Sequence, residues 1–177
     1  MRASPRIALL CLAACSTAAP LTAQSLQRFS LQGSGAVLFA TRKDPEGFES
    51  KTRLGWEAQA RYTFSRFSLG AGYQRSTVFT SPALNLVLSL GFIEPRMVVA
   101  ASGSVAFYVA GRAGLGKLVC SETCNAPSTN KMYGGGAGIL LKLGRRVSGD
   151  LAGQFFQMSG DLSSGYAMAR AGLSLGL

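Results

Sequence analysis

The sequence predicts an all-β protein, an eight-stranded antiparallel up-and-down transmembrane β-barrel, and three observations lead to this fold class. Apolar and polar residues alternate with a period of two along eight segments, which is typical of strands with two different faces. The connections between these segments alternate in length. Hydrophobic residues make up 47% of the chain and its mean hydropathy is +0.23, yet after residue 23 every apolar run is too short to span a bilayer as a helix.

The first 23 residues form a segment that we expect to be removed. Arg2 and Arg6 precede an apolar run and then a stretch of small, weakly polar residues, as in a secretory signal peptide at 1–23. Cleavage after Ala23 leaves a β-barrel domain at 24–177. An alternative is that "LAAC" is a lipobox, in which Cys15 becomes a lipid-modified N-terminus. Either route exports the chain.

The first three strands are expected at 29–40, 53–64 and 67–75. The alternation is clearest in the second, "RLGWEAQARYTF", where Trp56 and Tyr62 share one face and Glu57 and Arg61 share the other. In the first and third strands, Phe and Leu alternate with Ser, Gln and Gly in the same way.

The fourth and fifth strands are expected at 84–100 and 105–118. The fourth strand opens with an apolar row that we place on the lipid side, namely Leu86, Leu88, Leu90 and Phe92. The alternation then slips by one near Ile93, and Pro95 follows, which together predict a β-bulge. Beyond this bulge Glu94 and Arg96 face inward, and Arg112 faces inward from the fifth strand.

The last three strands are expected at 132–144, 147–157 and 165–177. Each carries at least one charged residue on the face opposite its apolar row. These inward residues are Lys142 in the sixth strand, Asp150 in the seventh and Arg170 in the eighth.

The connections also indicate a barrel. Short turns are expected at 65–66, 101–104 and 145–146. Longer connections, richer in polar and turn-forming residues, are expected at 41–52, 76–83, 119–131 and 158–164. Short turns on one rim and long loops on the other are typical of outer-membrane barrels, and an even number of strands places both termini on the short-turn, periplasmic rim.

A soluble, lipocalin-like ligand-binding barrel is the alternative to a membrane barrel. It would turn Glu57 and Arg112 to water, but it would have to enclose Trp56, Phe107 and Phe155 together with many leucines. The interior of eight strands is only wide enough to be filled by side chains. We therefore expect the apolar rows to face lipid and the charged residues to face the lumen, because a basic group on the lipid face near the midplane costs about 2–4 kcal/mol.

The inward charges are expected to form a salt-bridged plug, because an unpaired buried charge is costly. The residues of this lumen charge network are Glu57, Arg61, Glu94, Arg96, Arg112, Lys142, Asp150 and Arg170. Such a plug leaves the lumen polar and mostly occluded. The alternative is that the same residues line a narrow pore for ions or small solutes.

Two cysteines lie in the mature chain, Cys120 and Cys124. Export to an oxidising compartment allows them to form a disulfide, which contributes about 2 kcal/mol for so short a loop. A metal site is the alternative, but two thiols without any His make a poor ligand set. We expect neither a metal nor a cofactor.

Over about residues 26–177 the chain resembles small eight-stranded outer-membrane proteins of the OmpA/OmpX type. The most specific part of the resemblance is "RAGLSLGL", in which alternate apolar positions look like the signal read by the barrel-assembly machinery, namely Ala171, Leu173, Leu175 and Leu177. Such signals usually end in an aromatic residue, and Leu177 departs from that. The resemblance implies insertion into the bacterial outer membrane from the periplasm, and we expect a monomer.

Charge and residue content narrow the function. Outer-membrane acyltransferases, deacylases and proteases generally use a His, and this chain has none, so we expect no enzyme. Without Arg2 and Arg6 the chain keeps 16 basic and 8 acidic residues, a net charge of +8, which in an exported protein suits anionic lipid rather than nucleic acid. Basic residues expected near the outer rim suit lipopolysaccharide phosphates, namely Arg42, Lys43, Lys51, Arg53, Arg75, Lys117 and Lys131. We expect a role in membrane integrity or in surface interaction through the loops.

Overall fold

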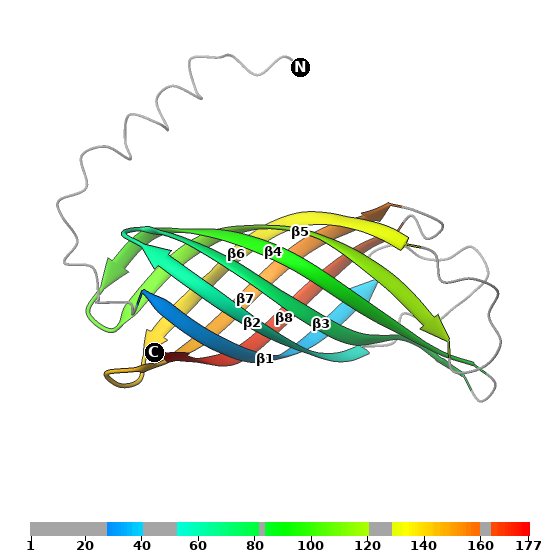
Figure 1. Cartoon of the computed structure of the whole chain (residues 1–177), viewed down its shortest axis with the longest axis horizontal. Helices are drawn as coiled ribbons and strands as arrows, with labels where there is room; N and C mark the ends of the chain where they lie inside the picture. The colour runs from blue at the N-terminus through cyan, green and yellow to red at the C-terminus, as the bar shows by residue number, and fades with distance from the viewer. Residues whose placement is uncertain (1–27, 41–52, 82–83, 121–128, 160–163) are drawn as a thin grey trace, which may run out of the picture.

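The computed structural model of the chain describes residues 28–40, 53–81, 84–120, 129–159 and 164–177. They form eight strands, β1 (Phe29–Ala40), β2 (Arg53–Phe64), β3 (Phe67–Ser81), β4 (Leu84–Ser102), β5 (Val105–Cys120), β6 (Thr129–Lys142), β7 (Val147–Ser159) and β8 (Ser164–Gly176). Each strand pairs antiparallel with the next, and β8 pairs with β1, so the sheet closes into a barrel (Figure 1). The predicted fold class is confirmed. The signal peptide expected at 1–23 lies outside the described residues.

No helix in the described part of the chain is long and apolar enough to cross a membrane.

The two ends of the barrel differ. The connections 65–66, 103–104 and 143–146 lie at one end, where Leu177 N–H also donates to the carbonyl of Phe29 at 3.0 Å. We term this end the turn rim and the opposite end the loop rim. The tight turns include two residues with positive φ, Ser65 at 58° and Gly103 at 55°. Figure 1 shows the turns and the C-terminus together at the left end of the barrel.

Five strands reach farther toward the loop rim than the sequence predicted, namely β3, β5, β6, β7 and β8. The stretch 76–83 was expected to be a loop, but β3 continues to Ser81 and β4 begins at Leu84. This prediction was wrong because Ser and Thr were read as loop residues, although Thr, Val and Phe favour a strand. Ser76 lies in the lumen, 1% exposed, and accepts a 2.9 Å hydrogen bond from Gln74. β5 likewise runs on to Cys120, and β6 begins at Thr129.

The outer face of the barrel is apolar and the inner face holds the charges. On β2 the ring of Trp56 is 50% exposed while its neighbour Glu57 is 2% exposed, and on β7 Phe155 is 53% exposed while Phe156 is 1% exposed. This orientation confirms the membrane barrel and contradicts the lipocalin-like arrangement.

Aromatic side chains mark both edges of the outer apolar belt. Phe64 and Phe67 stack beside the Ser65 turn, with ring centroids 6.3 Å apart, and Trp56 meets Tyr73 nearer the loop rim at 5.8 Å. Along β2, Trp56 and Phe64 lie 64 − 56 = 8 residues apart. At about 3.3 Å per residue and a tilt of about 40°, they are separated by about 20 Å along the barrel axis. This is close to the apolar band of about 25 Å in membrane barrels.

The placement of the leucine row of β4 on the lipid side was wrong. Leu88, Leu90 and Phe92 are 1%, 0% and 4% exposed and lie in the lumen on the same face as Glu94 and Arg96. The side chain of Leu86, the fourth member of the row, lies outside the described part of the structure. The outward residues of this stretch are Val87, Ser89 and Gly91, followed by Ile93, which is 54% exposed. The two faces therefore do alternate, but neither carries a charge, so the pattern alone does not show which face meets lipid.

The β-bulge predicted near Ile93 and Pro95 is absent from β4. The ladder with β3 runs without interruption through the pair Leu69↔Pro95, and the irregularities lie instead at Thr77/Phe79 and at Val98/Ala100. Pro95 has no N–H to donate. The ladder between β4 and β5 is interrupted at Glu94 and Pro95 and resumes in the same register at Arg96. The missing N–H therefore causes only a local gap in the ladder.

Apolar side chains fill the lumen toward the loop rim. This apolar plug consists of Ala36, Leu38, Leu88, Leu90, Phe92, Met132, Phe156, Met158, Tyr166 and Met168. Phe156 and Tyr166 stack at its edge with ring centroids 5.7 Å apart. The lumen is therefore occluded as predicted, but only part of it is polar.

We expect the inside-out arrangement to be visible by fluorescence quenching. Trp56 is the one Trp in the sequence, so a Trp56→Phe background accepts a single new probe. Phe155→Trp in that background, refolded into vesicles, should be strongly quenched by brominated lipid because position 155 faces outward. Phe156→Trp should be quenched several-fold less because position 156 belongs to the apolar plug. Equal quenching of the two neighbouring probes would contradict the assigned faces.

Candidate functional site

The lumen charge network is built by the inward faces of five strands. β2 supplies Glu57 and Arg61, β4 supplies Glu94 and Arg96, and β5, β7 and β8 each supply one residue, namely Arg112, Asp150 and Arg170. Every one of these seven residues is 6% exposed or less. Strand parity turns them all inward, since residues two apart share a face, and the register of the strands places them at similar depth.

Glu94 is the centre of the network and forms ion pairs with four arginines. Its Oε1 lies 2.8 Å from Nη2 of Arg61 and 2.7 Å from Nε of Arg96. Its Oε2 lies 2.6 Å from Nη2 of Arg112 and 3.0 Å from Nη1 of Arg170. The side chain is 0% exposed, so these guanidinium groups replace water as its solvation shell.

The other two carboxylates extend the network in opposite directions. Glu57 pairs with Arg170 at 2.7 Å and with Arg112 at 2.9 Å. Asp150 pairs with Arg96 at 2.8 Å and more loosely with Arg170 at 3.4 Å. Arg170 therefore contacts all three carboxylates and joins them into one cluster.

Neutral polar side chains complete the cluster, and the sequence reasoning did not include them in the site. Gln32 and Tyr108 each donate a 2.6 Å hydrogen bond to Asp150, Gln154 donates to Glu94 at 2.9 Å, and Gln74 accepts from Arg112 at 2.9 Å. Their inward parity was readable in the sequence, but a charge-based search passes over glutamine and tyrosine.

Glycines and aromatic rings make room for the arginines. A Cβ on Gly70 would meet the guanidinium of Arg61 at 2.7 Å, so a larger residue there would displace the side chain. The guanidinium of Arg112 lies over the ring of Phe92 at 4.0 Å, and that of Arg96 over the ring of Tyr108 at 4.5 Å. The aromatic faces offer cations a favourable contact in a space with little water.

The network carries a small surplus of positive charge. Arg61, Arg96, Arg112 and Arg170 contribute four positive charges, and Glu57, Glu94 and Asp150 contribute three negative ones. The difference is 4 − 3 = +1. These are also the only carboxylate side chains in the described residues. Because each is held by at least two arginines, none of the three is available as a metal ligand, and no group of three or more metal-binding side chains occurs in the described part of the chain.

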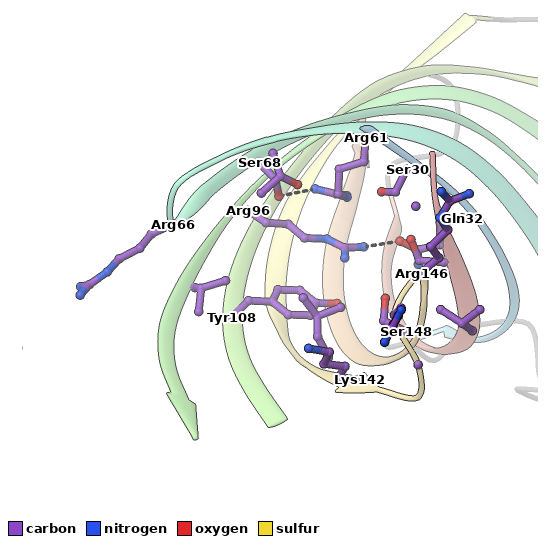
Figure 2. A pocket seen from close by; sticks show the side chains of 18 residues that line it. Ser30, Gln32, Arg61, Arg66, Ser68, Arg96, Tyr108, Lys142, Arg146 and Ser148 are labelled. Atoms are coloured by element: carbon purple, nitrogen blue, oxygen red, sulfur yellow. Dashed lines mark hydrogen bonds between the residues drawn. The ribbon is translucent and has the colours of Figure 1, made fainter. Parts of the chain in front are cut away.

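Lys142 does not join the network, although the sequence predicted that it would. It is the last residue of β6 and is exposed at the turn rim. There it lines a pocket with Arg61 and Arg96 (Figure 2). Its strand parity was read correctly, but parity does not say how deep along the barrel axis a residue lies.

The remaining predicted sites lie outside the lumen or outside the described residues. Cys120 ends β5, but Cys124 is not described, so the disulfide stays a prediction. The residues of the expected assembly signal are exposed on the outer face of β8 and just beyond it, namely Ala171, Leu173, Leu175 and Leu177. Their role in assembly stays a prediction.

Comparison with known proteins shows the fold alone. No protein-family model matches the sequence, and no curated protein matches it. Among solved structures, Neisserial surface protein A (NspA) superposes with a TM-score of 0.72 at 15% identity, covering 84% of this chain and 97% of that chain. Ail, the attachment invasion locus protein of Yersinia pestis, in complex with the heparin analogue sucrose octasulfate, gives 0.56 at 14% identity, covering 83% and 95%. The predicted resemblance to small eight-stranded outer-membrane barrels is confirmed at the level of the fold.

We expect Glu94→Gln to destabilise the barrel more than any other single carboxylate substitution in the network. Removing one partner from a buried ion pair typically costs about 3–5 kcal/mol, and here four arginines would lose their shared partner. Glu57→Gln is the matched control, because Glu57 is equally buried but pairs with two arginines. Urea unfolding of the refolded protein in detergent measures both free energies. An effect of Glu57→Gln as large as that of Glu94→Gln would contradict the central position of Glu94.

Proposed function

We propose that the chain is a non-enzymatic protein of the bacterial outer membrane, whose closed barrel anchors it in the bilayer and whose loop rim serves membrane integrity or surface interaction. The observation that carries this proposal is the inverted distribution of side chains. Large apolar residues cover the outside, whereas every carboxylate side chain of the described residues is enclosed in the lumen. Such a surface is stable in lipid and unfavourable in water.

The asymmetry of the two rims supports an orientation. Outer-membrane barrels have short turns on the periplasmic side and longer connections outside. We therefore assign the turn rim to the periplasm and the loop rim to the cell exterior. The loop-rim ends of β3, β4 and β5, which reach farthest at the right of Figure 1, then lie on the outer side.

Closure of the lumen argues against the pore alternative. An ion entering from the turn rim meets the charge network, in which the carboxylates and guanidinium groups are already paired with one another. Beyond the network it meets the apolar plug, where Leu88, Phe156 and Met158 are each 1% exposed. An apolar constriction of this kind excludes water and ions.

The lumen also lacks the usual elements of catalysis. The chain has no His to carry protons. The carboxylates of Glu57, Glu94 and Asp150 are each held by two or more arginines. A carboxylate held in this way is a poor general base, which supports a structural role for the network.

Lipopolysaccharide is the partner that we propose for the loop rim. Arg75, Lys117 and Lys131 are exposed on the outer face near that rim. Arg75 and Lys117 both lie opposite Ser89, one from each side, so they are two strand spacings apart, about 9–10 Å. Cations at this depth suit the phosphates of lipid A. The structure of Ail in complex with the heparin analogue sucrose octasulfate supports this proposal, because it shows a barrel of this fold with a sulfated sugar bound.

The proposed location and the closed lumen are tested together. Expressed in a Gram-negative host, the full chain should appear in the outer-membrane fraction as a band whose mobility changes on heating. The same protein refolded into planar bilayers should give no steady conductance, because the apolar plug blocks the lumen.

Two outcomes would contradict this proposal. Recovery of the folded protein in the soluble periplasmic extract would exclude the membrane anchor. Steady single-channel openings whose size changes in Arg112→Ala would favour the narrow pore.

We expect Arg75→Gln/Lys117→Gln to weaken binding of lipopolysaccharide by about tenfold to thirtyfold, because each cation near an anionic lipid surface contributes about 1 kcal/mol. Binding of labelled lipopolysaccharide to the refolded protein in a non-ionic detergent measures this change. Arg28→Gln, set against Arg75→Gln alone, is the matched control, since it removes one charge at the turn rim at a residue that does not line the pocket there. Equal losses in these two single variants would show an effect of net charge alone.

A further inference from the structure

An open pocket enters the lumen from the turn rim, and we term it the vestibule. Its floor is formed by Arg61 and Arg96, and its mouth by Lys142 and Arg146 (Figure 2). Arg145 also lines the pocket. These cations come from four different parts of the barrel, namely β2, β4, the end of β6 and the connection between β6 and β7. The cavity measures about 60 Å³, and since a water molecule needs about 10–15 Å³, it has room for several waters or a small ion.

The lining of the vestibule is strongly cationic and contains no carboxylate side chain. Every carboxylate side chain of the described residues belongs to the lumen charge network beneath the floor, where arginines already hold it. Within the described residues, Lys142, Arg145 and Arg146 therefore have no carboxylate side chain left to pair with. Cations that converge in a cavity with low-dielectric walls concentrate their field and attract anions.

The floor of the vestibule also holds a donor without an acceptor. Arg61 is 6% exposed, and its two terminal nitrogens bond to Ser68, Gln59 and Glu94. Its Nε has no hydrogen-bond partner among the described residues. Buried donors in folded proteins are almost always satisfied, so this N–H is suited to donate to a bound water or anion. The surplus of +1 in the network points the same way, because a buried charge without a counter-ion is costly.

We propose that the vestibule is an oxyanion site that binds a phosphate group. A phosphate offers several oxygens to the cations at the floor and the mouth at once, and guanidinium groups bind phosphate through paired, charge-assisted hydrogen bonds. Hydroxyl groups around the wall supply further donors, from Ser30, Ser68, Ser148 and Ser174. The bound anion compensates the surplus charge of the network.

Two sources could supply this phosphate. One is free phosphate in the solution that bathes the turn rim. The other is the phosphodiester of a phospholipid headgroup in the leaflet that surrounds that rim. The site itself is defined by the vestibule residues and does not depend on the function proposed for the loop rim.

Calorimetric titration of the refolded full chain in a non-ionic, phosphate-free detergent tests the proposal. One titrant is inorganic phosphate and the other is glycerophosphoglycerol, a soluble headgroup phosphodiester, both at constant ionic strength set with chloride. We expect saturable binding of at least one titrant with one site per chain. Lys142→Gln/Arg146→Gln should raise the dissociation constant at least tenfold. Arg75→Gln/Lys117→Gln, which removes the same charge near the loop rim, should leave it within twofold.

The results of the titration distinguish free phosphate from a headgroup phosphodiester, and both of these from a vestibule that binds no phosphate. Binding of inorganic phosphate alone assigns the site to the free ion, whereas equal or tighter binding of the phosphodiester assigns it to a headgroup. Absence of saturable binding for both titrants overturns the proposal. An unchanged dissociation constant in Lys142→Gln/Arg146→Gln, with heat-dependent mobility showing that this variant is folded, overturns it as well.

Discussion

The ion pairs around Glu94 are the constraint on which the barrel depends. Four arginines from β2, β4, β5 and β8 meet at this one carboxylate, and each can reach it only if its own strand turns the correct face inward. A shift of one residue in any of these strands would exchange its two faces. It would expose a guanidinium to lipid and bring an apolar side chain among charges. The network therefore fixes which face of β2, β4, β5 and β8 points into the lumen. The opposite, apolar face of each of these strands then lies on the outside of the barrel.

The sequence was sufficient for the fold and for most of the network because charge and parity were unambiguous where they mattered. In β2, Glu57 and Arg61 lie four residues apart on the same face of the strand, so this face must be the one that points into the lumen. The stretch 86–92 of β4 was different, because neither of its faces carries a charge and alternation alone does not show which face meets lipid. Extending the parity of Glu94 and Arg96 back along β4 would have placed Leu88 and Phe92 in the lumen. Lys142 is separated from the network by its depth along the barrel axis. This depth depends on the tilt and stagger of the strands, which a local sequence pattern does not reveal.

The lumen is divided along its axis into three zones with different physical roles. The apolar plug supplies a packed core of the kind found in soluble proteins, which excludes water from the loop-rim half. The lumen charge network next to it needs that exclusion, because ion pairs at 2.6–3.0 Å gain strength where water is scarce. The vestibule is the zone that solvent reaches. An outer surface that is equally apolar everywhere cannot specify one structure in lipid, so the specificity of this barrel resides largely in its interior.

The distribution of charge along the barrel follows that of a bilayer. The middle of the barrel is nearly balanced, with four positive and three negative groups enclosed together. The described cations outside the network lie at the two ends, among them Arg75 and Lys117 near the loop rim and Lys142 and Arg146 at the turn rim. These are the levels at which a membrane presents its phosphates. Arg61 and Arg96 belong to the network and also line the vestibule, so the surplus positive charge of the network is next to the vestibule. The apolar plug closes the lumen on the loop-rim side. An anion that balances this charge therefore enters from the turn rim.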